Sequence, residues 1–331
     1  MPLAALLLLT WGLLPLLVVA PRHRQKVPRI LVRLFTGQDT NLMPEWQTLL
    51  SALREHDVDV SDRDMPRPVG GGDISAAWRV KANDHSIFLK TGPASSYDMF
   101  LAEAEGLREL AQADALRVPR VLGCVQSASE SLLALEWIDF DLPGTDTESL
   151  LGQQLAKQHR YCSDRFGWHR DNTIGSTPQR NLWNDDWIEF LKEDRLGFQL
   201  MLAAENGFTG ELQQEGGRVL SNLGQFFSGY WPEASLLHGD LWGGNWASSG
   251  GEPVIFDPAV HYGDRESDIA MTKLFGGFSA GFYRAYEEAW PLAAGSEKRI
   301  SLYQLYHVLN HLNLFGQSYL GRALGIIRSL N

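Results

Sequence analysis

Short apolar stretches separated by turns mark the first half of the chain. Residues 74–80 and 86–90 are two such stretches, and Gly70, Gly71, Gly72 and Asp73 precede them. A glycine-rich turn followed by two short apolar stretches predicts a β-hairpin. Two further strands are predicted at 118–124 and 131–138, and the second of them runs into a polar loop.

Helical spacing dominates the rest of the chain. Between Tyr97 and Ala113, apolar residues recur on one helical face, at Phe100, Leu101, Ala104, Leu107 and Leu110. The segment 43–47 is expected to run into an amphipathic helix that ends at about Glu55, and other helices are predicted at about 150–161, 187–206, 211–227, 267–290 and 297–315. A strand-rich first half and a helix-rich second half predict an α+β fold with two lobes and a site between them. We expect the lobes at 43–138 and 139–331.

The N-terminus differs from both lobes. Residues 3–20 are almost wholly apolar and are followed by a basic segment. This length is enough for a membrane-spanning helix, whose basic flank would keep the body of the protein in the cytosol. A cleaved signal peptide fits poorly, because no basic residue precedes the apolar run and Pro21 follows it directly. The alternative, which the sequence slightly favours, is that residues 1–42 come from an incorrectly assigned start and that the protein begins at Met43.

Composition narrows the class of protein. The chain has 331 residues, of which 44% are hydrophobic, enough to bury a core in each of two lobes. A net charge of −11 argues against a broad nucleic-acid-binding surface. Cys124 and Cys162 lie far apart without metal-ligand spacing, so neither a disulfide framework nor a structural zinc site is expected. A reducing compartment, the cytoplasm, fits this cysteine usage.

The candidate chemistry gathers near the C-terminal third. The segment from His238 to Asn245, HGDLWGGN, has the H-x-D-L-x-x-x-N spacing of a kinase catalytic loop, and Asp257 follows in an apolar run. Phosphoryl transfer needs one carboxylate to orient a hydroxyl, with an Asn and an Asp to hold magnesium. Each residue alone has an ordinary explanation as a turn or cap residue. Together they predict Asp240 as the catalytic carboxylate, with Asn245 and Asp257 as Mg²⁺ ligands.

Candidate nucleotide-binding residues lie upstream of this segment, in the order in which such parts occur in a kinase. The backbone amides of Gly70, Gly71 and Gly72 are expected to cover phosphates, and Lys90 at the end of its strand is expected to reach them. Glu103 and Glu105 are candidates for steering Lys90, and Glu103 is preferred. ATP and Mg²⁺ are the predicted cofactors. The adenine is expected at the loop after residues 131–138, on backbone groups of Glu136, Trp137 and Ile138.

These motifs resemble the fructosamine kinase (ketosamine 3-kinase) family. The resemblance spans about residues 43–330. The segments that carry it are LLHGDLWGGN at 236–245, FDPA at 256–259, YGDRE at 262–266, LFGGF at 274–278, FGWH at 166–169, IGSTPQ at 174–179, Asp186-Trp187 with Arg195-Leu196, and YQLY at 303–306. Aminoglycoside phosphotransferases and choline kinases share only the barer core of this pattern.

The resemblance implies a two-lobed, protein-kinase-like fold and ATP-dependent phosphorylation of the sugar 3-hydroxyl on ketoamine adducts of amines. It implies a deglycation role, since the product releases the amine. Trp242 replaces the lysine of protein kinases, Pro258 follows Asp257, and no Ala-Pro-Glu segment occurs, so a small-molecule kinase is favoured over a protein kinase. The alternatives are a kinase of the aminoglycoside or choline type, or a nucleotide-binding module without catalysis.

Roles for the remaining polar residues complete the expectation. An ordinary aspartate pKa of about 3.9 would make Asp240 a weak base. His238 and Asp268 are expected to support the catalytic loop. Candidate substrate contacts, chosen for their closeness in sequence to the site, are Trp242, His261, Asp264 and Arg265.

Overall fold

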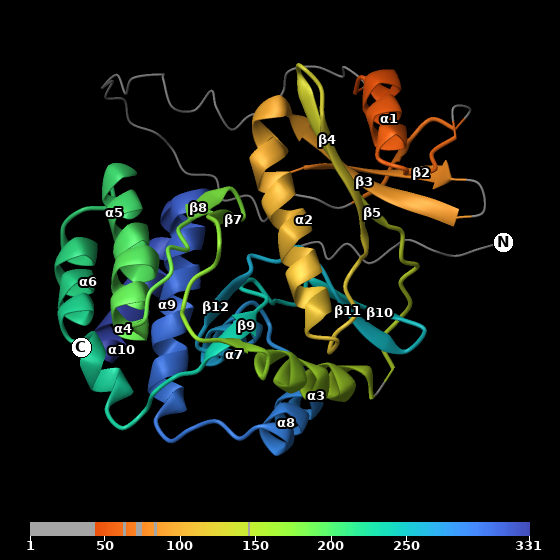
Figure 1. Cartoon of the computed structure of the whole chain (residues 1–331). Coiled ribbons are helices and arrows are strands. Elements are labelled where there is room, and N and C mark those ends of the chain that lie inside the picture. The colour runs from red at the N-terminus through yellow and green to blue at the C-terminus, as the bar shows by residue number, and fades with distance from the viewer. Residues whose placement is uncertain (1–43, 62–63, 71–74, 83–84, 145) are drawn as a thin grey trace, which may run out of the picture. The chain divides into compact units, whose positions relative to one another are not determined.

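A five-stranded antiparallel sheet forms the N-terminal part of the protein (Figure 1). The structure is a computed structural model and describes residues 44–331 except 62–63, 71–74, 83–84 and 145. The order of strands in the sheet is β1-β2-β3-β5-β4. Their bounds are Arg67–Pro68 for β1, Ala76–Ala82 for β2, His85–Pro93 for β3, Val121–Gln126 for β4 and Glu130–Glu136 for β5.

One helix covers each face of this sheet. Side chains alternate between the two faces of a strand, so a strand covered on both sides is apolar throughout. On β5, Leu132 and Ala134 pack towards helix α1 (Trp46–Glu55), whereas Leu133 and Leu135 pack towards helix α2 (Tyr97–Gln112). The same alternation on β3 puts Ile87 and Leu89 in the α1 core, which leaves Lys90 on the α2 side.

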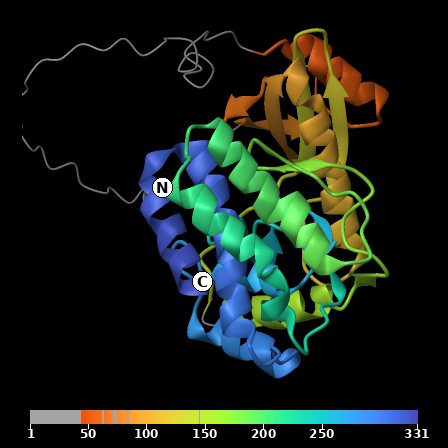
Figure 2. The same ribbon diagram turned by 90° about the vertical axis from the view of Figure 1, so that its left-hand side faces the viewer.

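Helices build the C-terminal part around a single large core. They are α3 (Thr147–His159), α4 (Trp187–Phe190), a π-helical turn (Leu191–Gly197), α5 (Phe198–Glu205), α6 (Glu211–Ser221), α7 (Glu266–Thr272), α8 (Ala280–Ala289), α9 (Ser296–Phe315) and α10 (Leu320–Leu330). Short 3₁₀ turns lie at Ala94–Ser96, Leu223–Phe227 and Gln317–Tyr319. Figure 2 shows α5 and α6 lying beside α9 and α10, and these helices contact one another.

Short strands in the C-terminal part carry the loops of interest. A three-stranded sheet has the order β12-β9-β6, and β10 pairs with β11 in a hairpin. A second small hairpin is formed by β7 and β8. The bounds are Cys162–Ser163 for β6, Asn172–Ile174 for β7, Thr177–Gln179 for β8, Ala234–Leu237 for β9, Trp246–Ser249 for β10, Glu252–Ile255 for β11 and His261–Gly263 for β12.

The predicted α+β organisation is confirmed, with two errors in the helices. The single helix expected at 267–290 is two helices, because Phe275, Gly276 and Gly277 all have positive φ and end the helical path. The sequence analysis missed α10, which begins beyond Gly316, another residue with positive φ (84°). The apolar segment 3–20 lies outside the described residues. In the part of the chain that is described, no helix is long and apolar enough to cross a bilayer.

Candidate active site

Strand β9 delivers the catalytic loop. All four of its residues are buried, and the chain leaves it as His238-Gly239-Asp240. Gly239 turns the chain with φ +82°, and a Cβ on it would lie 2.1 Å from the carbonyl oxygen of Ala259. Glycine is therefore required here, both for its conformation and for this close approach. The turn brings Asp240 to a half-buried position beside Asn245.

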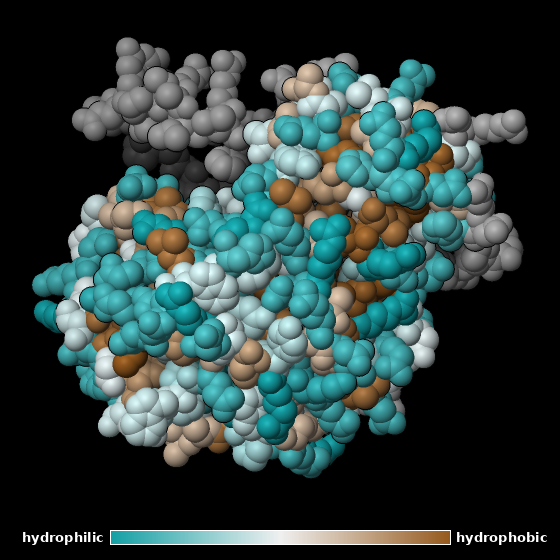
Figure 3. All heavy atoms as spheres, in the orientation of Figure 1, coloured by the Kyte–Doolittle hydropathy of each residue, from teal (hydrophilic) through white to brown (hydrophobic). Residues whose placement is uncertain are grey.

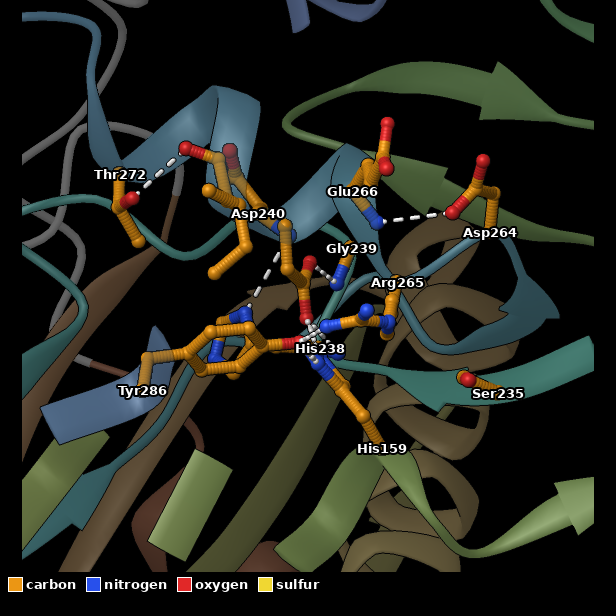
Figure 4. Close-up of polar contacts among 12 residues, drawn as sticks. His159, Ser235, His238, Gly239, Asp240, Asp264, Arg265, Glu266, Thr272 and Tyr286 are labelled. Carbon is orange, nitrogen blue, oxygen red and sulfur yellow. Dashed lines mark hydrogen bonds and ion pairs between the residues drawn. The ribbon is translucent and has the colours of Figure 1, made fainter. Parts of the chain in front are cut away.

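Asp268 of helix α7 holds the loop by its backbone. Its carboxylate accepts hydrogen bonds from the backbone N–H groups of His238 (2.8 Å) and Gly239 (2.9 Å). Burial favours protonation of Asp268, but the hydrogen bonds from His159 and from the backbone N–H of Gly239 keep its pKa below the usual value. His159 lies 3.2 Å from Asp268 and 2.9 Å from the Tyr286 hydroxyl, inside a buried polar cluster (Figure 4).

His238 braces the loop from its other side. Its Nε2 donates to the carbonyl oxygen of Phe256 (2.9 Å), and its Nδ1 accepts from the N–H of Asp240 (3.2 Å). Burial lowers the pKa of this imidazole, so it is neutral. A neutral ring with one donor and one acceptor satisfies both contacts, and His238 is then a brace and not a base.

The β10–β11 hairpin brings the two predicted metal ligands together. Asn245 precedes β10 and Asp257 follows β11, and the N–H of Phe256 donates to the carbonyl oxygen of Asn245 (3.1 Å). Asn245 Nδ2 lies 2.9 Å from the Asp240 carbonyl oxygen and 3.4 Å from its carboxylate. Asp257 has φ +57°, an unusual conformation for a residue other than glycine.

This pair has the right chemistry for magnesium. Mg²⁺ prefers hard oxygen ligands such as carboxylates and carbonyls. The Asp257 side chain is 47% exposed, so its carboxylate is open to a ligand, and the amide of Asn245 lies in the same turn region. The donor set therefore fits the predicted cofactor.

Lys90 connects the sheet with the catalytic region. It lies on the α2 face of β3, and its Nζ contacts the carboxylates of Glu103 (2.7 Å) and Asp257 (2.6 Å). Burial alone would lower the pKa of Lys90, but the two carboxylates raise it above its usual value. Glu103 occupies the same helical face as the buried Phe100 and Leu107, and this face is directed towards the sheet.

Glu105, the alternative partner for Lys90, has another role. Its carboxylate contacts His169 Nε2 (2.9 Å) and Arg170 Nη1 (3.0 Å). Arg170 also pairs with Asp98 at the start of α2. On the same helix, a Cβ on Gly106 would meet Val260 at 3.1 Å. These contacts hold α2, and with it Glu103, against residues 169–170 and against the segment that follows Asp257.

The pKa of Asp240 differs from the expected ordinary value. Burial, followed by the negative charges of Asp257 and Asp268, raises the pKa of Asp240 well above its usual range. The expectation of a weak base was wrong for this reason, since the sequence does not show which carboxylates gather around a side chain. A higher pKa makes Asp240 a more effective proton acceptor, because acid–base catalysis is best when the pKa is near the operating pH.

The residues predicted to bind the adenine lie around the end of β5. Ile138 is 8% exposed, and the Trp137 ring packs under the guanidinium of Arg79 at 4.3 Å. The N–H of Glu136 donates to the backbone carbonyl oxygen of Arg120 (2.8 Å), so this N–H group is already hydrogen-bonded. Figure 3 shows apolar side chains gathered around the lower end of β5. Gly70 lies before β2 with open space around it, whereas Gly71 and Gly72 lie outside the described residues.

Two of the four predicted substrate residues are buried and hydrogen-bonded within the core. Asp264 is fully buried, and its carboxylate oxygens accept hydrogen bonds from Tyr230 (3.0 Å) and Tyr303 (2.6 Å). Arg265 is 6% exposed and donates to the Tyr286 hydroxyl and to two backbone carbonyl groups. Their closeness in sequence to the site misled the prediction, because β12 carries them into the core.

The other two substrate candidates remain near the site. Trp242 is 37% exposed in the catalytic loop. His261 is 4% exposed and lines a small cavity that also touches Gly239. His169 and Arg195 lie in segments that carry the family resemblance, but the sequence analysis predicted no role for either, and it missed His159 and Arg170. Their partners come from distant elements, so spacing along the chain does not reveal their contacts.

Comparison with known proteins identifies the family. Residues 45–331 match the family model described as fructosamine kinase. The chain belongs to the fructosamine kinase family. The members of this family are phosphotransferases with an alcohol acceptor, which agrees with the resemblance in the catalytic loop.

Curated relatives cover most of the chain. A "probable ketoamine kinase" of Synechocystis sp. is 41% identical over 285 residues, which are 86% of this chain and 96% of that protein. A chloroplastic protein-ribulosamine 3-kinase of Oryza sativa subsp. japonica is 42% identical over 264 residues, covering 78% of this chain and 76% of that protein.

Solved structures support the kinase-like fold. A "putative fructosamine-3-kinase" from Thermobifida fusca is 32% identical, with a TM-score of 0.77 over 85% of this chain and 97% of that one. An aminoglycoside phosphotransferase in complex with ADP and hygromycin B is 17% identical, with a TM-score of 0.56 over 86% of this chain and 97% of that one. The second likeness shows the fold alone. Both agree with the predicted protein-kinase-like architecture.

Proposed function

We propose that this member of the fructosamine kinase family is an ATP-dependent ketosamine 3-kinase. It transfers the terminal phosphoryl group of ATP to the sugar 3-hydroxyl of a ketoamine adduct, and the product then releases the amine. The observation that supports this most strongly is the 41% and 42% identity to a ketoamine kinase and a ribulosamine 3-kinase. The arrangement of Lys90, Asp240, Asn245 and Asp257 around one region supports the same activity.

The nucleotide is bound by the N-terminal part. Lys90, steered by Glu103, pairs with phosphate oxygens, and the backbone amides of Gly70, Gly71 and Gly72 cover the phosphates. Backbone groups of Trp137 and Ile138 bind the adenine. Lys90 contacts Asp257 at 2.6 Å, so nucleotide binding exchanges this ion pair for contacts of Lys90 with phosphate.

Asn245 and Asp257 would hold Mg²⁺ through their side-chain oxygens, and the ion would supply neutralisation of charge on the phosphoryl group. Asn245 has a second function, because its Nδ2 lies within reach of the Asp240 carboxylate (3.4 Å). A buried amide in this position keeps Asp240 turned towards the acceptor.

Asp240 orients the acceptor hydroxyl and takes its proton. The hydroxyl oxygen forms a bond to the terminal phosphorus, the bond from that phosphorus to the bridging oxygen of ADP breaks, and the proton moves to the Asp240 carboxylate. A loose phosphoryl transition state requires mainly positioning and charge neutralisation. The rigid loop around Gly239 and Asp268 supplies the positioning.

A substrate panel tests the proposal. Purified protein is assayed for ADP formation with ribulosyl-lysine, fructosyl-lysine, choline and an aminoglycoside, at millimolar Mg²⁺. We expect turnover of ketosamines and none of choline or the aminoglycoside, and the opposite pattern would refute the assignment. Asp240→Asn should lower kcat by about 10²–10⁴-fold with ATP affinity retained, because it removes the proton acceptor and leaves the nucleotide contacts in place.

A further inference from the structure

A small cavity lies beside the catalytic loop, on the side of the C-terminal helices. Its volume is ≈ 20 Å³, which is room for about one water-sized polar group and too little for a sugar ring. Its lining comes from α4, the π-helical turn, the catalytic loop, β12, α7 and α9. Its lining includes Gly239 and the polar side chains of Arg195, His261, Ser267, Tyr303, Tyr306 and His307.

Arg195 is the unusual member of this lining. It is 2% exposed, and its guanidinium donates to neutral oxygens, namely the carbonyls of Arg180 and Asp194 and the side chain of Asn181 (2.7 Å). The carboxylate of the adjacent Asp194 lies instead near Arg180 (3.9 Å). Burial lowers the pKa of the guanidinium, since the charge is disfavoured away from water.

Arg195 and His307 each have a nitrogen without a partner. Among the residues that the structure describes, Arg195 Nε and His307 Nδ1 are buried and make no hydrogen bond. Burial lowers the pKa of His307 to about 3, so its ring is neutral and can donate or accept. Buried polar groups are nearly always hydrogen-bonded, and an exception needs an explanation such as an external partner.

The local backbone supports the same conclusion. Arg195 lies in the π-helical turn Leu191–Gly197, and single π turns inside α-helices are frequent at functional sites. The cavity touches Gly239, the residue before Asp240. Tyr306, also in the lining, is close enough to Asp240 for the carboxylate to help raise its pKa. A group held in this cavity would therefore lie next to the reacting hydroxyl.

We propose that this cavity binds the hydroxyl-bearing end of the sugar acceptor, with Arg195 and His307 as its hydrogen-bonding residues. This inference rests on the ketosamine kinase function proposed above. A ketosamine carries a positive amine at one end and neutral hydroxyls at the other. The guanidinium repels the amine end, whereas its N–H groups donate well to hydroxyl oxygens. A terminal hydroxyl of the sugar is thus directed into the cavity, which has room for one such group, and the amine is directed away from it.

The experiment removes one hydroxyl at a time from the substrate. The methylamine adduct of a ketopentose is compared with its 4-deoxy and 5-deoxy analogues, using kcat/KM of the wild-type enzyme. We expect kcat/KM for one analogue to be lower by about 10- to 100-fold, because the missing hydroxyl leaves buried donors in the cavity unpaired. If both analogues stay within about threefold of the parent, the proposal is wrong.

Variants then locate the effect in the cavity. In the His307→Leu variant, kcat/KM for the parent substrate should fall to the value that the wild-type enzyme has for the poorer analogue. KM for ATP should stay unchanged. Arg195→Lys should also reduce the ratio of kcat/KM between the parent substrate and the poorer analogue. This second variant keeps the proposal testable if His307→Leu does not fold. His311→Leu is the matched control, since His311 lies one turn along α9, bonds to the His307 carbonyl oxygen and does not line the cavity.

Two other outcomes are distinguishable. The glycine adduct of the same ketopentose adds a carboxylate on the amine side. If it is preferred over the methylamine adduct and the preference disappears in the His307 and Arg195 variants, the cavity holds that carboxylate and the sugar assignment is refuted. If wild-type enzyme phosphorylates no ketosamine at all, the proposed function itself fails, and this inference fails with it.

Discussion

Replacing Gly239 by alanine should damage both catalysis and stability, whereas the same change at Gly243 should do neither. Both glycines belong to the segment 238–245. Gly239 has φ +82°, and its added Cβ would lie 2.1 Å from the Ala259 carbonyl oxygen. Gly243 has no atom within 4 Å of its added Cβ. The pair isolates the conformational requirement from any general effect of mutating the loop.

The magnitude follows from the geometry. A left-handed conformation costs alanine about 1–2 kcal/mol. Relief of the clash needs a shift of about 1 Å to reach the 3.0 Å below which real Cβ contacts essentially never fall. The Ala259 carbonyl accepts a hydrogen bond from Gln179 (3.1 Å), and this bond is strained or lost, at a cost of about 1 kcal/mol. The expected loss is about 2–3 kcal/mol, which lowers Tm by roughly 4–12 °C.

Catalysis should fall further than stability alone explains. A displacement of about 1 Å at the reacting group costs on the order of 10²-fold in rate. The assays are thermal unfolding and steady-state ADP release at a temperature where Gly239→Ala remains folded. If Gly239→Ala matched Gly243→Ala in both Tm and kcat, the reasoning about this turn would be wrong.

Further predictions concern helix α2, proton transfer and the core. Arg170→Ala should raise KM for ATP by about 3- to 10-fold through loosening of α2, with Arg165→Ala as an exposed control in the same segment, and an unchanged KM would contradict it. The pKa of Asp240 is raised by burial and by nearby carboxylates, so kcat/KM should fall as pH drops through a value above the ordinary value of about 3.9; a profile that stays flat down to about pH 4 would exclude Asp240 as the base. Glu266→Ala should destabilise the protein by about 3–5 kcal/mol in denaturant unfolding, because it leaves the buried Arg299 without its carboxylate partner (2.8 Å), and a loss below about 1 kcal/mol would refute this.

The sequence predicted those parts of the site that are local. The segment HGDLWGGN, the apolar run to Asp257 and the hairpin strand that carries Lys90 all follow from spacing within a few residues, although β3 continues beyond the predicted end at Lys90 to Pro93. Glu103, which was preferred over Glu105, shares a helical face with Phe100 and Leu107, and its carboxylate contacts Lys90 (2.7 Å). A short-range pattern fixes such features because neighbouring residues on a strand or helix have a set geometry.

The tertiary structure decided which distant residues meet. The ordinary pKa expected for Asp240 was wrong because two other carboxylates, from β11 and α7, gather near it. Asp264 and Arg265 looked like substrate contacts from their position in sequence, yet β12 carries them into the core.

By itself, the chain determined its α+β organisation and its family resemblance, and it predicted which carboxylate is catalytic. Only the folded structure determined the brace around Gly239, the contacts that hold α2, and the cavity that joins Arg195 to His307. The physical reason is that burial and electrostatics depend on what surrounds a side chain, and those surroundings come from elements far apart in the sequence.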